Sequence, residues 1–314
     1  MKKAAVLPAQ GIGDGLLMLV ASYNLQEAGY EVTTYQPLLK QLTPWLKTKN
    51  FLNIPTISEI EQFSKEYDLI VLQNDNSPLA QKLISLKREG ILNQLVVFYP
   101  TYHFNKHGPI YQNDHVFEEN VCMVENIAKA TSKLLKLPGV SRNNGLIPLP
   151  GLEHRKNSNR IVLHPTSSQE NKNWPYKKFI SLAKKLEEQD FEVVFAVSPI
   201  EHENWKKITE NRWLVPLLPT LSDLAILIYE SSCVIGNDSL IGHLASNLQI
   251  PSVVVANDEK RMRLWRPGWL KGEVITPSSF LAKWIFRKRS KKKWSKFISV
   301  SNVIKRFNKI NRKP

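Results

Sequence analysis

The stretch that decides the fold is Cys233–Pro251, CVIGNDSLIGHLASNLQIP. It opens with Cys233–Ile235, a short apolar run that is typical of a buried strand, and continues with the polar turn Gly236–Ser239. We expect a helix to begin near Leu240, and the apolar run Ser252–Ala256 to form the next strand. The stretch therefore predicts half of a βαβ unit, in which the amino end of the helix lies at the carboxyl ends of parallel strands.

Two interpretations of the polar residues in this stretch are open. Asp238 and Ser239 can be ordinary caps of the helix, with His243 one turn later satisfied inside the fold. Alternatively they contact a ligand, because the free N–H groups and the positive dipole end of such a helix suit phosphate. An Asp at this place would then indicate a ligand with hydroxyl or ammonium groups beside its phosphates.

Apolar runs alternate with helical patterns along the rest of the chain. The other predicted strands are residues 4–9, 31–35, 67–73, 94–99, 160–164, 192–197 and 213–215. The other predicted helices are residues 16–28, 79–87, 113–137, 176–189, 221–231 and 300–310. Strands that alternate with helices predict an α/β fold with parallel sheets.

The 314 residues are enough for two domains. Residues 138–159 are rich in Pro and Gly and form the best candidate linker. We therefore expect one domain at residues 1–150 and a second at 151–282. Residues 283–314 would form a basic segment and a closing helix that packs back on the body.

Several classes of protein are disfavoured by the composition. Cys122 and Cys233 stand far apart in apolar surroundings, which argues against a disulfide framework and fits a reducing, cytoplasmic setting. The spacing of His103, His107 and His115 matches no metal motif, so we expect no metal. No apolar run approaches the roughly 20 residues that span a bilayer, and the early N-terminus does not resemble a signal peptide. We expect a soluble protein.

The net charge of +15 is concentrated at the end of the chain. Residues 260–314 hold 18 Lys and Arg and one acidic residue, whereas the rest is close to neutral. Basic residues there alternate with Trp and Phe, a pattern that suits an anionic membrane surface. The residues expected at that surface are Lys283, Arg287, Lys288, Arg289, Lys291, Lys292 and Lys293. The alternatives are a solvated charge run and nucleic acid, and we do not expect nucleic acid.

A glycine-rich loop, Gln10–Gly15, follows the first predicted strand. Its glycines allow a tight turn, but their spacing is not G-x-G-x-x-G and the loop has no P-loop Lys, so it is a weak dinucleotide signal. Asp14 lies where the loop meets the helix. It is either a helix cap or a general base beside a ligand.

A polar loop, Pro165–Pro175, follows the first strand of the second half. Its hydroxyl and amide groups and its single Lys suit phosphoryl oxygens, and the alternative is a polar loop with a core Trp174. The strand 192–197 is followed by carboxylates that can accept hydrogen bonds from a ribose. Three strand ends would thus bring one set of polar residues to one sheet edge: Ser167, Lys172, Glu201 or Glu203, Asp238 and Ser239.

Four ordered motifs give the chain a resemblance to a known family. They are GIGD at Gly11–Asp14, HPTSSQENKNWP at His164–Pro175, GNDSLIGHLA at Gly236–Ala245, and ISVSNV at Ile298–Val303. Together they resemble glycosyltransferase family 9, the bacterial heptosyltransferases of lipopolysaccharide core assembly. The resemblance implies the GT-B architecture, with two Rossmann-like α/β domains facing across a cleft, an acceptor domain first and a nucleotide-sugar domain second.

The resemblance also implies an activity. Members transfer a sugar with inversion from a nucleotide donor, here expected to be ADP-heptose, to a lipopolysaccharide core or another glycan, without a metal or other cofactor. It implies a cytoplasmic protein that lies peripherally on the inner face of the inner membrane of a Gram-negative bacterium, near a lipid-linked acceptor. The alternative is a catalytically idle GT-B module that binds a nucleotide sugar or glycan as an adaptor.

Site roles follow from the same resemblance. Asp14 matches the general base. Lys172 would offset charge on the leaving diphosphate, and either Glu201 or Glu203 would bind the ribose. The full set of expected donor-binding residues is Ser167, Ser168, Lys172, Glu201, Glu203, Asp238, Ser239, Leu240, Ile241 and His243. Leu240 is a departure, because the family commonly has Gly there and a Leu side chain could crowd the donor.

Overall fold

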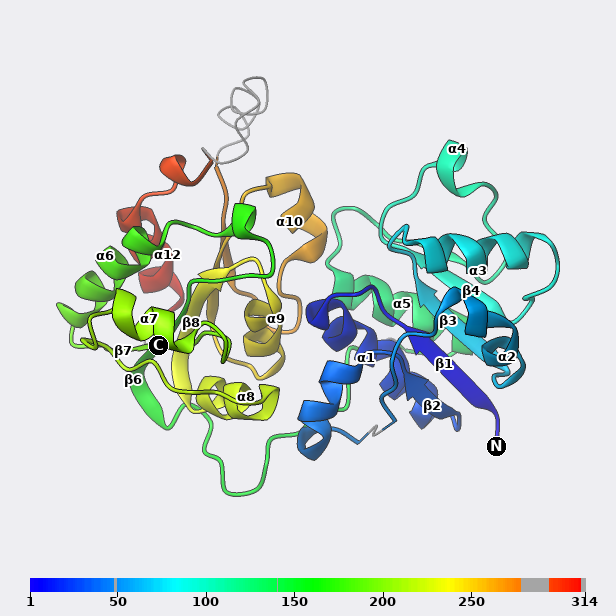
Figure 1. Cartoon of the computed structure of the whole chain (residues 1–314), viewed down its shortest axis with the longest axis horizontal. Helices are drawn as coiled ribbons and strands as arrows, with labels where there is room; N and C mark the ends of the chain where they lie inside the picture. Colours follow the sequence, from blue (N-terminus) through cyan, green and yellow to red (C-terminus); the bar gives the residue numbers. More distant parts are fainter. Residues whose placement is uncertain (48–49, 140, 278–293, 312–314) are drawn as a thin grey trace. The chain divides into compact units, whose positions relative to one another are not determined.

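The computed structural model describes residues 1–47, 50–139, 141–277 and 294–311. The chain divides into two compact units, Met1–Ile147 and Pro148–Pro314. Each unit is built around its own parallel sheet covered by helices, so the predicted α/β class and its two-sheet organisation are confirmed (Figure 1).

The first unit holds a five-stranded parallel sheet in the order β2-β1-β3-β4-β5. Its strands are β1 (Lys3–Leu7), β2 (Glu31–Thr34), β3 (Leu69–Gln73), β4 (Leu95–Tyr99) and β5 (His115–Val116). Its helices are α1 (Ile12–Glu27), α2 (Ile60–Lys65), α3 (Pro78–Arg88), α4 (Phe104–His107) and α5 (Met123–Leu135), with the 3-10 segments η1 (Pro37–Trp45) and η2 (Ile57–Glu59). Helices α1 and α5 pack together on one face of the sheet, and α2 and α3 cover the other (Figure 1).

The second unit holds a five-stranded parallel sheet in the order β10-β9-β8-β6-β7. Its strands are β6 (Asn157–His164), β7 (Glu192–Phe195), β8 (Ser231–Asn237), β9 (Ser252–Val255) and β10 (Glu273–Ile275). Its helices are α6 (Tyr176–Glu187), α7 (His202–Ile208), α8 (Leu221–Tyr229), α9 (Leu240–Asn247), α10 (Glu259–Trp265) and α12 (Val300–Ile310), with η3 (Glu170–Lys172) and η4 (Trp294–Phe297).

The two sheets share one topology, which decides where a site can form. In each sheet the first strand lies between the second and the third, so the chain reverses its direction of travel across the sheet at that point. The loops that leave β1 and β3, or β6 and β8, diverge to opposite faces. Ligands of open α/β sheets bind at the carboxyl ends of strands at such a switch point.

Apolar runs became strands because both faces of each sheet are covered. All seven residues of β8 are buried, as expected of a central parallel strand. The predicted closing helix is also present as α12, where Val303 and Phe307 are fully buried and pack against the sheet unit. Cys122 and Cys233 are free thiols, both buried.

Three predicted elements were wrong in their limits or type. Helix α1 begins at Ile12 rather than Leu16, so Gly11 is its N-cap and Asp14 lies inside the first turn. The helix predicted over residues 113–137 begins only at Met123, and β5 precedes it. The run 213–215 forms a single bridge, Val194 to Leu214, instead of a strand. Strands β5 and β10 were missed, because both are too short to show a pattern.

The physical reason for the late start of α5 is a buried ion pair. The Asp114 carboxylate lies 2.5 Å from the Lys87 ammonium and accepts hydrogen bonds from the N–H groups of Val97 and Tyr111. The bonds to Lys87 and Val97 are long-range and hold the chain around Asp114 out of a helix, and local periodicity gives no sign of them. Among the described helices, none is long and apolar enough to cross a membrane.

Candidate functional site

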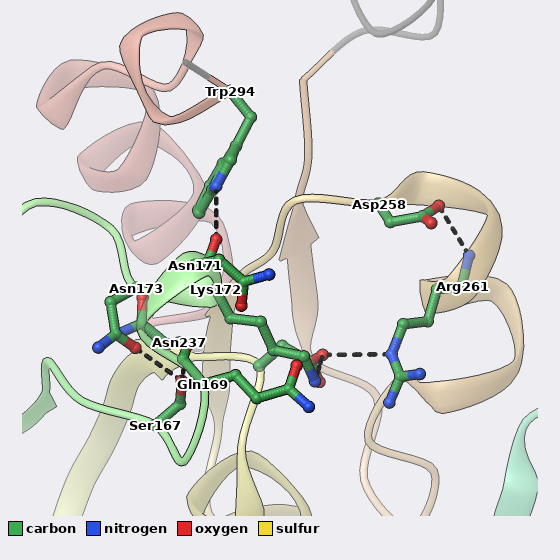
Figure 2. Close-up of polar contacts among 10 residues, drawn as sticks. Ser167, Gln169, Asn171, Lys172, Asn173, Asn237, Asp258, Arg261 and Trp294 are labelled. Carbon is green, nitrogen blue, oxygen red and sulfur yellow. Dashed lines mark hydrogen bonds and ion pairs between the residues drawn. The ribbon is translucent and has the colours of Figure 1, made fainter. Parts of the chain in front are cut away.

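The centre of the candidate site in the second unit is the carboxylate of Asp238, the first residue after β8. Its Oδ2 atom lies 3.1 Å from Lys172 Nζ and 3.6 Å from Arg261 Nε, and Asp238 is only 8% exposed. The two cations come from η3, after β6, and from α10, after β9 (Figure 2). One carboxylate with two cationic side chains leaves an excess positive charge at the switch point, which suits an anionic ligand.

Arg261 is a site residue that the sequence interpretation missed. Its guanidinium lies 4.8 Å from the ring centre of Trp265, and Asp258 caps the start of α10 by accepting a hydrogen bond from the Arg261 N–H. The available signal was Asp258, which comes two residues after the predicted strand 252–256 and three positions before the Arg. Its relation to Asp238 depends on the neighbouring position of β8 and β9, which is a tertiary feature.

The side-chain amide of Asn237 joins the two loops of the switch point. Its Nδ2 donates to the carbonyl of Pro165 at 2.7 Å, and its Oδ1 accepts from the backbone N–H of Trp174 at 2.9 Å. Asn237 is completely buried. Both ends of the polar loop after β6 are thus fixed to the end of β8, which sets the position from which Lys172 reaches Asp238.

The remaining residues of this polar loop have different surroundings. Ser167 Oγ lies 2.6 Å from Asn173 Oδ1 and 2.9 Å from the carbonyl of Gln169, so it organises the loop itself. Ser168 is exposed. Trp174 is 1% exposed and donates to the carbonyl of Ile298, so the loop is polar and also anchored by a core Trp.

The amino end of α9 carries two buried polar atoms without partners among the described residues. Ser239 is the N-cap but makes no side-chain cap bond, and its Oγ is buried. His243 Nδ1 is likewise buried, and burial lowers the pKa of this imidazole to about 4, so the ring is neutral at pH 7. The reading of an ordinary cap with a satisfied histidine therefore does not describe this end. Beside it Leu240 is half-buried and Ile241 is buried in the core.

The two candidate carboxylates after β7 are not equivalent. Glu201 Oε2 accepts hydrogen bonds from Thr166 Oγ1 at 3.1 Å and from Ser198 Oγ at 2.5 Å, which ties it to the loop after β6. Glu203 has a side chain that is 74% exposed, and its carboxylate lies 3.0 Å from His202 Nδ1. The hydrogen bonds hold Glu201 at the switch-point edge, so it is the better placed of the two for a ligand hydroxyl.

Asp14 belongs to the first unit, at the matching switch point between β1 and β3. Its Oδ1 accepts a hydrogen bond of 3.0 Å from Gln73 Nε2, while Gln73 Oε1 accepts from the Ala9 N–H at 3.3 Å. The second bond fixes the orientation of the amide, so its NH2 group must face Asp14. A Cβ atom on Gly11 would lie 2.5 Å from Asp14 Oδ2, so a glycine is required there for the carboxylate to keep this place.

Gln73 is a second residue that sequence reasoning missed. It ends β3 and is 1% exposed, and its amide makes a part-buried hydrogen bond with Asp14. The seven predicted membrane-surface residues lie outside the described residues. In the part of the chain that is described, no group of three His, Cys, Asp or Glu side chains is placed to hold a metal ion.

The two hydrogen bonds of the Asn237 side chain, to Pro165 and Trp174, are called the Asn237 clamp, and they can be tested by mutation. We expect Asn237→Ala to destabilise the second unit by about 2 to 4 kcal/mol, because it leaves the Trp174 N–H and the Pro165 carbonyl buried without partners. Urea unfolding would measure the loss, and hydrogen exchange of the Trp174 N–H would rise. Asn204→Ala, at an exposed position, is the control; equal stability of the two variants would contradict the clamp.

Comparisons with known proteins agree with this architecture. Residues 109–268, just over half of the chain, match the model of glycosyltransferase family 9 (heptosyltransferase). No curated protein sequence matches the chain.

Three solved structures share the fold over nearly the whole chain. The Escherichia coli ADP-heptose lipopolysaccharide heptosyltransferase II is 18% identical, with a TM-score of 0.69 and 98% of each chain covered. A family 9 glycosyl transferase of Veillonella parvula is 18% identical, with a TM-score of 0.69, 99% of this chain and 97% of that one covered. E. coli heptosyltransferase WaaC with ADP is 16% identical, with a TM-score of 0.64, 99% of this chain and 100% of that one covered. With two parallel-sheet α/β units, the four motifs and the family match in agreement, the chain belongs to glycosyltransferase family 9, the heptosyltransferase family, and has the GT-B fold.

Proposed function

We propose that this glycosyltransferase moves a heptose or a related sugar, with inversion, from a nucleotide-sugar donor to a hydroxyl group of a lipopolysaccharide core or another glycan. ADP-heptose is the favoured donor. The observation that carries the proposal is the cluster of Lys172, Asp238 and Arg261 at the switch point, beside the unpartnered hydroxyl of Ser239.

The charges of this cluster support a diphosphate ligand. Lys172 and Arg261 are held by one carboxylate, so each retains donors that are free to contact phosphate oxygens. The backbone N–H groups at the start of α9 and the Ser239 hydroxyl add further donors. WaaC has been solved with ADP and with ADP-2-deoxy-2-fluoro heptose, which supports the choice of donor class.

The transfer itself needs a base and a stabilised leaving group. In the proposed step the acceptor oxygen forms a bond to the anomeric carbon of the donor sugar, and the bond between that carbon and the diphosphate oxygen breaks. Asp14 takes the proton of the acceptor hydroxyl, and Gln73 keeps the carboxylate in place. Lys172 and Arg261 stabilise the negative charge that stays on the diphosphate. Because these two side chains already supply positive charge, metal-independent transfer is part of the proposal.

Leu240 favours the second candidate, an idle module that binds a nucleotide sugar or glycan as an adaptor. It is the first residue of α9 and is half-buried beside Ser239. A side chain at this place narrows the space above the helix end. Binding of a panel of ADP- and UDP-sugars to the wild type and to Leu240→Gly distinguishes the two alternatives. A changed donor preference means that the wild type binds a different set of sugars from Leu240→Gly. A lost one means that the wild type binds none of them.

Asp14→Asn tests the role of the base. We expect transfer to fall by roughly 10² to 10⁴, the usual contribution of a general base, while the affinity for ADP stays unchanged. ADP release from ADP-heptose with core-oligosaccharide acceptors would measure the rate, and calorimetry the affinity. Gln73→Leu should lower kcat without a comparable change in the donor KM. Wild-type turnover by Asp14→Asn would refute the assignment.

Lys172→Ala tests the donor site. We expect the affinity for ADP and ADP-heptose to fall by about 10 to 100-fold, because a charge-assisted contact to phosphate is lost. Lys185→Ala, which changes an exposed Lys on α6, is the matched control. Calorimetry should separate the two variants, and indistinguishable affinities would remove Lys172 from the donor site.

Chelation with EDTA in the transfer assay tests metal independence. Activity should be unchanged, and a loss of activity would contradict metal-independent transfer.

We also propose that the enzyme works at the inner face of the inner membrane of a Gram-negative bacterium, held there by the basic segment. The support is the charge of the sequence, because these residues lie outside the described ones.

Vesicle flotation tests this membrane proposal. Wild-type protein should float with anionic vesicles at low salt and lose binding as salt rises, because the attraction is electrostatic. A variant with Gln at the seven basic positions from Lys283 to Lys293 should not float. This variant keeps Trp294, whose indole N–H donates to the Asn171 carbonyl beside Lys172. Binding that does not depend on salt would contradict an electrostatic attachment.

A further inference from the structure

A cavity of about 260 Å³ lies in the first unit at the carboxyl ends of β1 and β3. Leu7 and Leu72, near the ends of these two strands, line it together with residues of the loops that follow. Gln73, which holds Asp14, comes directly after Leu72. The cavity is therefore at the switch point of this unit, where open α/β sheets bind ligands.

Its size and its apolar part restrict the ligand. Pockets for drug-sized molecules usually measure about 300 to 1,000 Å³, so this one suits a single ring better than a nucleotide. Leu7 and Leu72 are almost fully buried, and Pro78 and Leu79 from the start of α3 add further apolar surface. These aliphatic side chains offer van der Waals contacts to the C–H groups of a sugar ring.

The polar part of the lining carries one negative charge. Asp75 Oδ1 accepts a hydrogen bond from the Ser77 N–H, whereas its Oδ2 accepts none from the described residues. Ser77 Oγ accepts from the Ala80 N–H as the cap of α3, so its hydroxyl proton can still be donated. The side-chain amide of Gln10 also lines the cavity. A carboxylate oxygen, a hydroxyl and an amide match the hydroxyl groups of a sugar.

Cations are missing from this lining. Among the described residues that line the cavity, none is a Lys or an Arg. A phosphate or carboxylate placed there would face Asp75 without a compensating charge, and like charges at an interface lower affinity. The contrast with the second unit is direct, because there two cations surround one acid.

We propose that this cavity binds an uncharged, hydroxyl-rich sugar ring and disfavours one that carries a phosphate or a carboxylate. In the proposed transfer it would hold the ring that offers its hydroxyl to Asp14; only this assignment as the acceptor rests on the proposed function. The residue that sets the preference is Asp75, and the apolar lining supplies the face against which the ring packs.

The test uses the full chain without a donor, and saturation-transfer NMR as the readout. The probes are methyl glycosides of glucose, galactose and mannose at about 10 mM, suited to millimolar affinities, and the matched methyl uronosides. We expect the neutral glycosides to bind roughly five to ten times more tightly than the uronosides at low salt. The proposal would be overturned if no neutral glycoside gave a saturation-transfer signal, or if the uronosides bound as tightly as the neutral glycosides.

Variants locate the preference. Asp75→Asn keeps an acceptor for the Ser77 N–H and should bring the two probe classes within about twofold of each other, and Asp75→Lys should reverse the order. Glu61→Gln, an equal charge change at an exposed position on α2, should alter nothing. Leu79→Trp should fill the cavity and abolish the saturation-transfer NMR signal of all probes. An unchanged preference in Asp75→Asn, or unchanged binding in Leu79→Trp, would place the sugar elsewhere and overturn the assignment.

This experiment is independent of the proposed transferase. Calorimetry with ADP on the same samples reports the site in the second unit. Glycoside binding without ADP binding would remove the donor proposal and leave the cavity, whereas ADP binding without glycoside binding would do the opposite.

Discussion

The geometry of the candidate site in the second unit depends on the buried amide of Asn237. One donor and one acceptor of this side chain hold both ends of the loop after β6 against the end of β8. The loop can then be polar and exposed along its middle while Lys172 keeps a defined position. Loss of the amide would leave two backbone groups buried without partners, which is costlier than loss of a surface contact.

The two units have the same sheet topology but place different partners around the acidic residue at the switch point. Both sheets have the same strand order, so each has a switch point between its first and third strands. In the first unit a neutral amide, Gln73, donates a hydrogen bond to the Asp14 carboxylate. In the second unit the Asp238 carboxylate is matched by two cations. At the switch point of the second unit, one carboxylate and two cations leave an excess of positive charge.

The strands and most helices could be predicted from sequence because buried parallel strands and amphipathic helices leave a local pattern. The run Cys233–Ile235 and the closing helix at 300–310 are examples. Where an element is set by a distant partner, the pattern failed. The buried pair of Lys87 and Asp114 delays α5, and no periodicity within residues 113–137 reports it.

For the site, the sequence by itself determined the residue types and their order along the chain: glycines and Asp14 after the first strand, a hydroxyl-rich loop with Lys172, and Asp238 with Ser239 before a helix. Only the tertiary structure decided which of them meet. Arg261 joins Asp238 because β9 lies beside β8, and Gln73 reaches Asp14 because β3 lies beside β1. Strand neighbours are chosen by packing between distant segments, so their side-chain partners cannot be read from local sequence.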